Sequence, residues 1–339
     1  MLSWGNGAVG RGWGRRAAVS DGGSGEPGGM AFLERFPDIG STARSLMPET
    51  DRPGKVLAAV DRLARVPQLD GLIGPLQRAA HALPAGTRDV LHGKWLGHPL
   101  HPALVQTPIG MWSAAAVLDL LPGKRRDSGT LVAIGLAAAV PSAVAGWTDW
   151  ADLRKPQLRV GLVHAAANAG GIVLYAASLA ARLRGRRLRG KALGWAGFAL
   201  VGAGGALGGH LAYRQGAGAN HAEGVEAHVP AGWQPLGAVA DFPVGQAVRA
   251  ETGGVPVLVY REPGGAVRVL ADHCAHLGGP LSQGEITDGC VRCPWHGSLF
   301  RLTDGWNVEG PATAPQPAFE ARVVDGRVEA RLREPEAPS

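Results

Sequence analysis

The stretches Cys274-Ala275-His276 and Cys293-Pro294-Trp295-His296, with sixteen residues between them, decide how the C-terminal part of this chain is interpreted. Each stretch offers one thiolate and one imidazole. In a mixed-ligand 2Fe-2S cluster, two thiolates complete the coordination of one iron and two imidazoles complete that of the other. Two cysteines and two histidines also suit a structural zinc site, but zinc loops normally hold their cysteines in pairs. The spacing therefore favours the cluster over zinc.

Small residues follow both motifs, and small residues let backbone amides approach the sulfides of a cluster. The first motif continues as Leu277-Gly278-Gly279-Pro280 and the second as Gly297-Ser298-Leu299-Phe300. Together with the Pro-rich run 310–317, which is similar to a third, covering loop, these motifs resemble the Rieske ferredoxin family. The resemblance covers residues 229–333. The residues expected to surround the ligands are Leu277, Gly278, Gly297 and Ser298.

The resemblance implies a role for each ligand. Cys274 and Cys293 would bind the buried iron of a 2Fe-2S cluster, which is also the expected metal site of the chain. His276 and His296 would bind the outer iron with their ring edges toward solvent, where electrons leave.

Two differences from the family pattern indicate which kind of Rieske protein this chain resembles. The quinol-oxidising Rieske proteins carry an extra, disulfide-bonded cysteine in each loop, whereas this chain has Gly279 and Trp295 there. The pattern is thus similar to the soluble, dioxygenase-ferredoxin kind. Phe300 lacks the hydroxyl that a tyrosine gives the high-potential members, while Ser298 could donate to a sulfide, so we expect an intermediate or low potential. Cys290 is interpreted as a small strand residue rather than a ligand.

Residues 229–333 read as β structure throughout, with Gly-Gly and Asp-Gly pairs at the expected turns. A small antiparallel β domain is predicted. Its strands are expected at 234–239, 247–250, 255–260, 267–271, 289–292, 298–301, 318–324 and 328–332.

Composition points to a membrane rather than to nucleic acid. The chain has 34 Lys and Arg against 28 Asp and Glu, and the basic residues cluster between apolar runs instead of among aromatics. We therefore expect no nucleic-acid partner. Three cysteines exclude a disulfide scaffold, and thiols that bind iron and sulfide must be reduced when the cluster is built, which indicates cytosolic assembly.

Four long apolar runs precede the β domain, and each can span a bilayer because about 20 helical residues cover its hydrocarbon core. We predict a four-helix transmembrane bundle at 96–218, a linker at 219–228 and an all-β Rieske domain at 229–333. Buried helices of a soluble protein are the alternative. The motif His98-Pro-Leu-His101-Pro and later His and Gly positions resemble an uncharacterised bacterial four-helix membrane domain. The runs are Pro102–Leu121, Thr130–Trp150, Val160–Ala181 and Ala192–Tyr213.

The N-terminal part is expected to contribute little to the site. Residues 1–50 are Gly-rich and are predicted to be disordered; Arg15-Arg16 is followed by no apolar core, so no signal peptide is predicted, and Met30 is an alternative start. Residues 51–95 are predicted to be an amphipathic helical segment. His81 and His92 fall there and are interpreted as surface histidines.

Four histidines of the helical region form a second candidate site. With four spans, His98, His101, His164 and His210 all lie near the face that the β domain shares, and imidazoles from facing helices could ligate haem b or line a quinone pocket. Facing His164 and His210 would be the haem ligands to test. The alternative is that these histidines reach the membrane interface without a redox role.

The leading hypothesis is a membrane-anchored electron carrier that docks a reductase and an acceptor protein. The alternatives are a catalytic oxidoreductase with haem or quinone in the bundle and a non-catalytic redox sensor. A terminal oxygenase is not expected, because no 2-His-1-carboxylate iron site follows the β domain. The basic loops around 124–126 and 182–191 alone would place the β domain outside the cell, but the lack of an export signal favours the cytoplasmic side of a multi-pass cell-membrane protein.

Overall fold

The computed structural model describes residues 55–122 and 125–333. The structural relations below lie within the unit Ala59–Ser339. The expectations for residues 1–50, and for the side chains of the basic residues 124–126, fall outside the described part of the chain.

Short helices come first in the described chain. They are α3 (Lys55–Leu63), η1 (Pro67–Leu69), α4 (Asp70–His81), α5 (Ala85–Leu91) and η2 (Lys94–Leu96). Asp70 in the first turn of α4 accepts two hydrogen bonds from Arg159, at 2.7 and 2.8 Å. Buried Ile73 and Ala80 of α4 join an apolar cluster with Trp150 and Leu158. Helix α4 therefore packs against the ends of the long helices α8 and α9 that follow.

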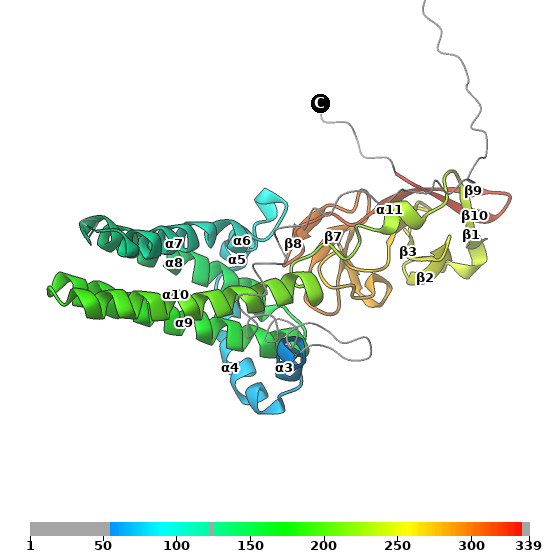
Figure 1. Cartoon of the computed structure of the whole chain (residues 1–339). Helices are drawn as coiled ribbons and strands as arrows, with labels where there is room; N and C mark the ends of the chain where they lie inside the picture. Colours follow the sequence, from blue (N-terminus) through cyan, green and yellow to red (C-terminus); the bar gives the residue numbers. More distant parts are fainter. Residues whose placement is uncertain (1–54, 123–124, 334–339) are drawn as a thin grey trace, which may run out of the picture. The chain divides into compact units, whose positions relative to one another are not determined.

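Four helical rods form the centre of the N-terminal half (Figure 1). The first consists of α6 (Leu100–Leu104) and α7 (Gln106–Leu120), and the others are α8 (Arg125–Ala151), α9 (Lys155–Leu183) and α10 (Arg187–Gly209), which ends in the π-helical turn η3 (His210–Arg214). All four are long and apolar enough to cross a membrane, as the sequence predicted. Only 22–28% of residues in their apolar windows are buried. Exposed Val173, Leu183 and Leu188 on their outer faces are suited to lipid rather than water.

The rods pack closely because glycines lie where they touch. A side chain at Gly171 would collide with Val201, and one at Gly197 would press on the Tyr175 ring. Tyr175 in turn stacks on Trp112, with ring centres 4.2 Å apart, and both are fully buried. Small residues at helix contacts are typical of helices that associate in lipid, where packing replaces the hydrophobic driving force.

The C-terminal half consists of two antiparallel sheets. One has the order β1-β10-β9-β4-β3-β2 and the other β5-β6-β7-β8. The predicted strands are present, and β5 and β8 are additional three-residue strands that were too short to show a periodic pattern. The strands are β1 (Gln234–Ala238), β2 (Ala247–Thr252), β3 (Val255–Arg261), β4 (Val267–Ala271), β5 (Glu285–Thr287), β6 (Cys290–Arg292), β7 (Leu299–Arg301), β8 (Asn307–Glu309), β9 (Ala318–Val324) and β10 (Arg327–Leu332).

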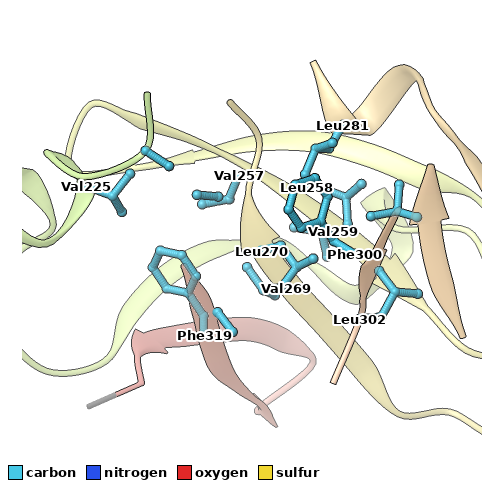
Figure 2. Packing of buried hydrophobic residues seen from close by; sticks show 14 of the residues in the cluster. Val225, Val257, Leu258, Val259, Val269, Leu270, Leu281, Phe300, Leu302 and Phe319 are labelled. Atoms are coloured by element: carbon cyan, nitrogen blue, oxygen red, sulfur yellow. The ribbon is translucent and has the colours of Figure 1, made fainter. Parts of the chain in front are cut away.

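Strand β3 lies at the centre of the β core (Figure 2). Its consecutive residues Val257, Leu258 and Val259 are all fully buried. Because neighbouring strand residues point to opposite faces, both faces of this sheet are covered at β3.

The segment predicted as a linker at 219–228 belongs to this core instead. Its Ala222 and Val225 are buried in it, Val225 beginning the short helix α11 (Val225–His228). The His221 amide also donates to Ala275 O at 2.8 Å. Half of this segment is polar (Asn220, His221, Glu223, Glu226 and His228), so the residue pattern did not indicate that Ala222 and Val225 would be buried.

Candidate functional site

The four predicted ligands come from two loops that begin at strand ends. Cys274 and His276 follow β4, and Cys293 and His296 lie in the connection between β6 and β7. The two loops close with the same backbone pattern. The amides of Cys274 and Cys293 donate to the carbonyl five residues ahead, and their carbonyls accept from the amide four residues ahead. Each loop is therefore shaped by its own short sequence.

Gly278 and Gly297 hold equivalent places in the two loops. Both have left-handed backbone, with φ of 75° and 77°, which glycine adopts without steric cost. Gly279 is required for a different reason, since a Cβ there would lie 2.8 Å from Cys293 Sγ. The expectation that small residues let backbone amides approach the sulfides stays a prediction, and the close approach seen here is to a cysteine sulfur.

The two cysteine sulfurs lie beside each other and are surrounded by backbone donors. Both cysteines are buried free thiols. The neighbouring Cys293 thiol and burial raise the pKa of Cys274. The Cys274 thiol, together with the amides of Trp295 and His296, lowers the pKa of Cys293 to about 7. A thiolate thus forms readily on Cys293, and a second negative charge beside it calls for a bound cation.

The two imidazoles lie together near the sulfurs. The ring centres of His276 and His296 are 5.0 Å apart and the rings are nearly perpendicular. Burial, with the His296 charge second, lowers the pKa of His276 to about 3, so this ring is neutral, as a metal ligand must be. Its Nδ1 is buried with no hydrogen-bond partner. A buried nitrogen without a partner is costly and is what an iron ligand would satisfy.

This donor set fits a 2Fe-2S cluster. Two adjacent thiols and two adjacent neutral imidazoles match the ligands of its two irons. Backbone amides already point at both sulfurs. Cys290 remains apart from this set, half-buried in β6 opposite Thr287 and Arg301.

Two buried polar residues connect the loops to the Pro-rich run. Gln316 Oε1 accepts from the Ala275 amide, and its Nε2 donates to Ala271 O and His273 O. Ser298 Oγ accepts from the Ala312 amide at 3.1 Å, which leaves its hydroxyl proton free to be donated. Ser298 was predicted, whereas Gln316 was missed. The available signal was a single long polar side chain within a run of Pro and Ala.

His92 is not the surface histidine that the sequence suggested. Its side chain is only 2% exposed, and Nδ1 lies 2.9 Å from Asp149 while Nε2 lies 3.4 Å from Asp152. His81 also bonds Asp152, at 3.0 Å. Burial alone would lower the pKa of His92, but the hydrogen bond with Asp149 and the charges of Asp149 and Asp152 outweigh it and raise the pKa to about 9. The helical region thus holds a buried imidazolium between carboxylates.

A cavity of about 30 Å³ joins this group to the cluster loops, lined by His92, Pro99 and Asp149 on one side and His276 and Pro311 on the other. That volume suits about one water molecule. His276 is 9% exposed. Its ring therefore does not face open solvent, contrary to expectation, because the helical part of the chain covers it; His296 is less buried.

The four histidines of the helical region do not gather at one point. His101 and His164 meet, with ring centres 6.2 Å apart. His98 is exposed and bonds Pro99 O, and the imidazole of His210 lies 3.9 Å from Asp61. The ring neighbour of His164 is thus His101 rather than His210.

Comparison with known proteins divides the chain in the same way. Residues 232–320 match the family model for the Rieske [2Fe-2S] domain, and residues 97–221 match that for a predicted membrane protein (DUF2231). The anthranilate 1,2-dioxygenase ferredoxin subunit of Burkholderia cepacia is 35% identical over 100 residues, which are 30% of this chain and 92% of that protein.

Two further relatives show how far the similarity extends. Ferredoxin CarAc of Metapseudomonas resinovorans is 32% identical over 28% of this chain and 90% of its own length. The oxygenase component of 3-ketosteroid-9-alpha-monooxygenase of Rhodococcus rhodochrous is 35% identical over 24% of this chain, but the match spans only 20% of that protein. The shared part is thus a ferredoxin-sized domain.

Proposed function

The chain belongs to the Rieske [2Fe-2S] domain family, and on that premise we propose that it is a membrane-anchored carrier of single electrons between a reductase and an acceptor protein. The β domain supplies the cluster site and the helical domain the anchor. The observation that carries the proposal is the meeting of two buried thiols and two neutral imidazoles, with the Nδ1 of His276 buried and unpartnered.

A bound 2Fe-2S cluster supplies a one-electron couple. The protein's own part is to direct backbone amides at both cysteine sulfurs, to favour the thiolate form of Cys293, and to keep His276 neutral by burial. Gln316 fixes the first loop by binding backbone groups on both sides of Cys274. A site held rigidly in this way changes little when the electron arrives or leaves, which favours rapid transfer. The ferredoxin relatives support a reductase and an oxygenase-type acceptor as the partner classes.

The proposed anchor consists of four spans. Its support is the apolar outer surface of the rods together with exposed tryptophans near their ends, at Trp95, Trp147 and Trp195. Tryptophan is enriched where a membrane meets water. Carbonate extraction of membranes tests this: the chain should stay in the pellet, and release into the supernatant would contradict four spans.

We place the β domain on the cytoplasmic side. Basic residues do not decide the matter, because Arg182 and Lys191 at one end bind Asp119, while Arg159 and Arg214 toward the other end bind aspartates as well. The supporting argument is chemical, since cluster assembly requires reduced thiols. Protease should remove the β domain in inside-out vesicles and leave it intact in right-side-out vesicles; the reverse pattern would overturn this assignment.

A quinone or haem in the bundle was the alternative. The four histidines on which it rested do not meet at one point: His101 faces His164, whereas His98 bonds Pro99 O and His210 lies beside Asp61. The electron-carrier function is therefore the one that the site supports best.

The test is a redox titration of the purified full-length chain in detergent. We expect two irons per chain, an electron paramagnetic resonance (EPR) signal on reduction by one electron, and a lower midpoint potential in His296→Cys, because a thiolate stabilises the oxidised cluster. Stoichiometric zinc in place of iron, or an unchanged midpoint in a variant that keeps its cluster, would overturn the assignment.

A further inference from the structure

The helical domain contains an internal repeat that positions its buried side chains in pairs. His101 and His164, Trp112 and Tyr175, and Asp119 and Arg182 are each 63 positions apart in the sequence. Members of a pair are also in contact: ring centres lie 6.2 Å apart in the first and 4.2 Å in the second, and Arg182 Nη2 lies 2.5 Å from Asp119 in the third. Along each rod, the second and third of these residues lie 11 and 18 positions after the histidine, which is about three and five helical turns. The three residues therefore lie on one face of each rod, and the two faces contact each other.

The neighbouring rods repeat in step with these pairs. Because a carbonyl can only accept, His101 Nδ1–H donates to Ser142 O at 2.8 Å, and His164 Nδ1–H donates to Gly204 O at 2.7 Å. Those two carbonyls are 62 positions apart. Gly146 and Gly208, each four residues further on, are also 62 apart, and a Cβ at either would lie 2.7 Å or 3.1 Å from the ring. The same surroundings of the imidazole, a carbonyl acceptor and a glycine four residues further on, therefore occur twice, once in each helical hairpin.

These hydrogen bonds give the two rings the same tautomer. With Nδ1–H donated to a backbone carbonyl, Nε2 carries the lone pair, which is the arrangement that protein surroundings give to metal-ligating histidines. Asn168 does not alter this, because its amide lies 3.3–3.4 Å from both nitrogens of His164, across the ring, and donates to His164 O. Each of the two rings thus keeps one nitrogen lone pair, on Nε2.

The spacing of the rings suits a shared ion. Two imidazoles on opposite sides of one ion, with metal–nitrogen bonds of about 2.1 Å, have ring centres roughly 6 Å apart, close to the 6.2 Å between His101 and His164. In the described part of the chain no third His, Cys, Asp or Glu joins them. Two protein ligands fall short of the four of a structural zinc site.

We propose that His101 and His164 bind one redox-active transition metal through their Nε2 atoms, at the internal two-fold axis of the helical domain. Imidazole suits iron and copper, and the metal arrives either as haem, whose ring supplies four ligands, or as copper. In secondary transporters built from internal repeats, binding sites lie at the interface between the repeats. The binding itself does not depend on the proposed electron-carrier function.

The position of the His101–His164 pair would let the metal exchange electrons with the cluster. This role, unlike the binding, rests on the proposed electron-carrier function. Pro99 and Asp149 line the cavity at His276. Pro99 is two residues from His101, and Asp149 is three residues from Gly146. The proposed metal site therefore lies within about one helical turn of the surface that covers His276. An electron leaving the reduced cluster would lower the oxidation state of the metal by one, and no proton or other co-reactant is needed.

The experiment uses the full-length chain in detergent, titrated separately with hemin and with copper(I). We expect one equivalent of one of them per chain beyond the two irons of the cluster. His101→Ala and His164→Ala should each weaken binding at least a hundredfold while the cluster signal persists. His98→Ala and His210→Ala are matched controls on the same face and should bind as the wild type does.

A readout on the wild type keeps the proposal testable if a variant fails to fold. EPR of the metal-loaded, oxidised chain should show coupling to two imidazole nitrogens. The proposal is overturned if the wild type binds neither probe, if binding survives both His101→Ala and His164→Ala, or if no imidazole coupling is seen. None of these results bears on whether the cluster itself carries electrons.

Discussion

The cluster loops and the buried group around His92 differ in how their members are brought together. The four cluster ligands lie within residues 274–296, and each loop is closed by hydrogen bonds between near neighbours. The carboxylates that hold His92 are 57 and 60 positions away, on the end of α8 and just beyond it. A site formed by residues that are close in the sequence depends on local backbone geometry, whereas a site formed by distant segments depends on helix packing. The predictions below test this difference.

The largest effect is expected from removing a thiolate. Cys274→Ala should abolish the cluster, with loss of both irons, because the remaining three ligands leave the inner iron open. Cys290→Ala is the matched control and should retain the full cluster, since that thiol lies apart in β6. Iron content and EPR of the purified proteins measure both. A cluster that persists in Cys274→Ala, or disappears in Cys290→Ala, would contradict the ligand assignment.

Gln316→Leu should destabilise the β domain by about 3 kcal/mol, because it removes three buried hydrogen bonds to backbone groups of the first loop. The control is Gln234→Leu in the same domain, whose side chain makes an exposed bond to Ala231 O, and it should cost less than about 1 kcal/mol. Thermal unfolding followed by cluster absorbance gives the comparison. Equal losses in the two variants would show that Gln316 does not hold the loop.

His92 should make the stability of the helical domain depend on pH. Its pKa is raised to about 9 in the folded state, against about 6.5 for an unfolded histidine. The stabilisation is therefore fully present below pH 6.5 and is lost as the pH rises through 9. It amounts to on the order of 2–3 kcal/mol.

Thermal unfolding of the wild type and of His92→Gln across this range measures the difference between them. The gap in stability should narrow as the pH rises from 6.5 to 9, and exposed His98→Gln should show no such trend. His81 and Asp152 also belong to the group, so only the difference between variants reports His92. A gap that stays constant with pH would show that the imidazole is neutral in the folded protein.

The smallest effect concerns Ser298. Its hydroxyl is fully buried and accepts from Ala312 N, so its proton can be donated to a cluster sulfur. Ser298→Ala should lower the midpoint potential by about 50 mV, because hydrogen bonds to sulfur favour the reduced cluster. Thr287→Ala, an exposed hydroxyl of β5, is the control. Potentials that agree within error for Ser298→Ala and wild type would exclude the donated bond.

The sequence by itself determined the two-part organisation and predicted the four candidate cluster ligands. Four apolar runs of spanning length, and two Cys–His motifs followed by Gly278 and Gly297, are local patterns, and the physics that they obey is local too: helix length, left-handed turns and the reach of a backbone amide. Leu277 and Ser298 were found in the same way, from their adjacency to ligands. Gln316 was not, because its function lies in three bonds across 41 to 45 residues of chain.

Only the tertiary structure decided which distant residues meet. The spacing of apolar residues along a helix fixes its length and faces but not its rotation or depth against neighbouring helices. The sequence therefore suggested His210 as the partner of His164, whereas packing supplies His101, and it read His92 as a surface residue although two aspartates enclose it. Burial of Ala222 and Val225 was decided in the same way, since small apolar residues are compatible with a linker or a core until a partner surface is in place.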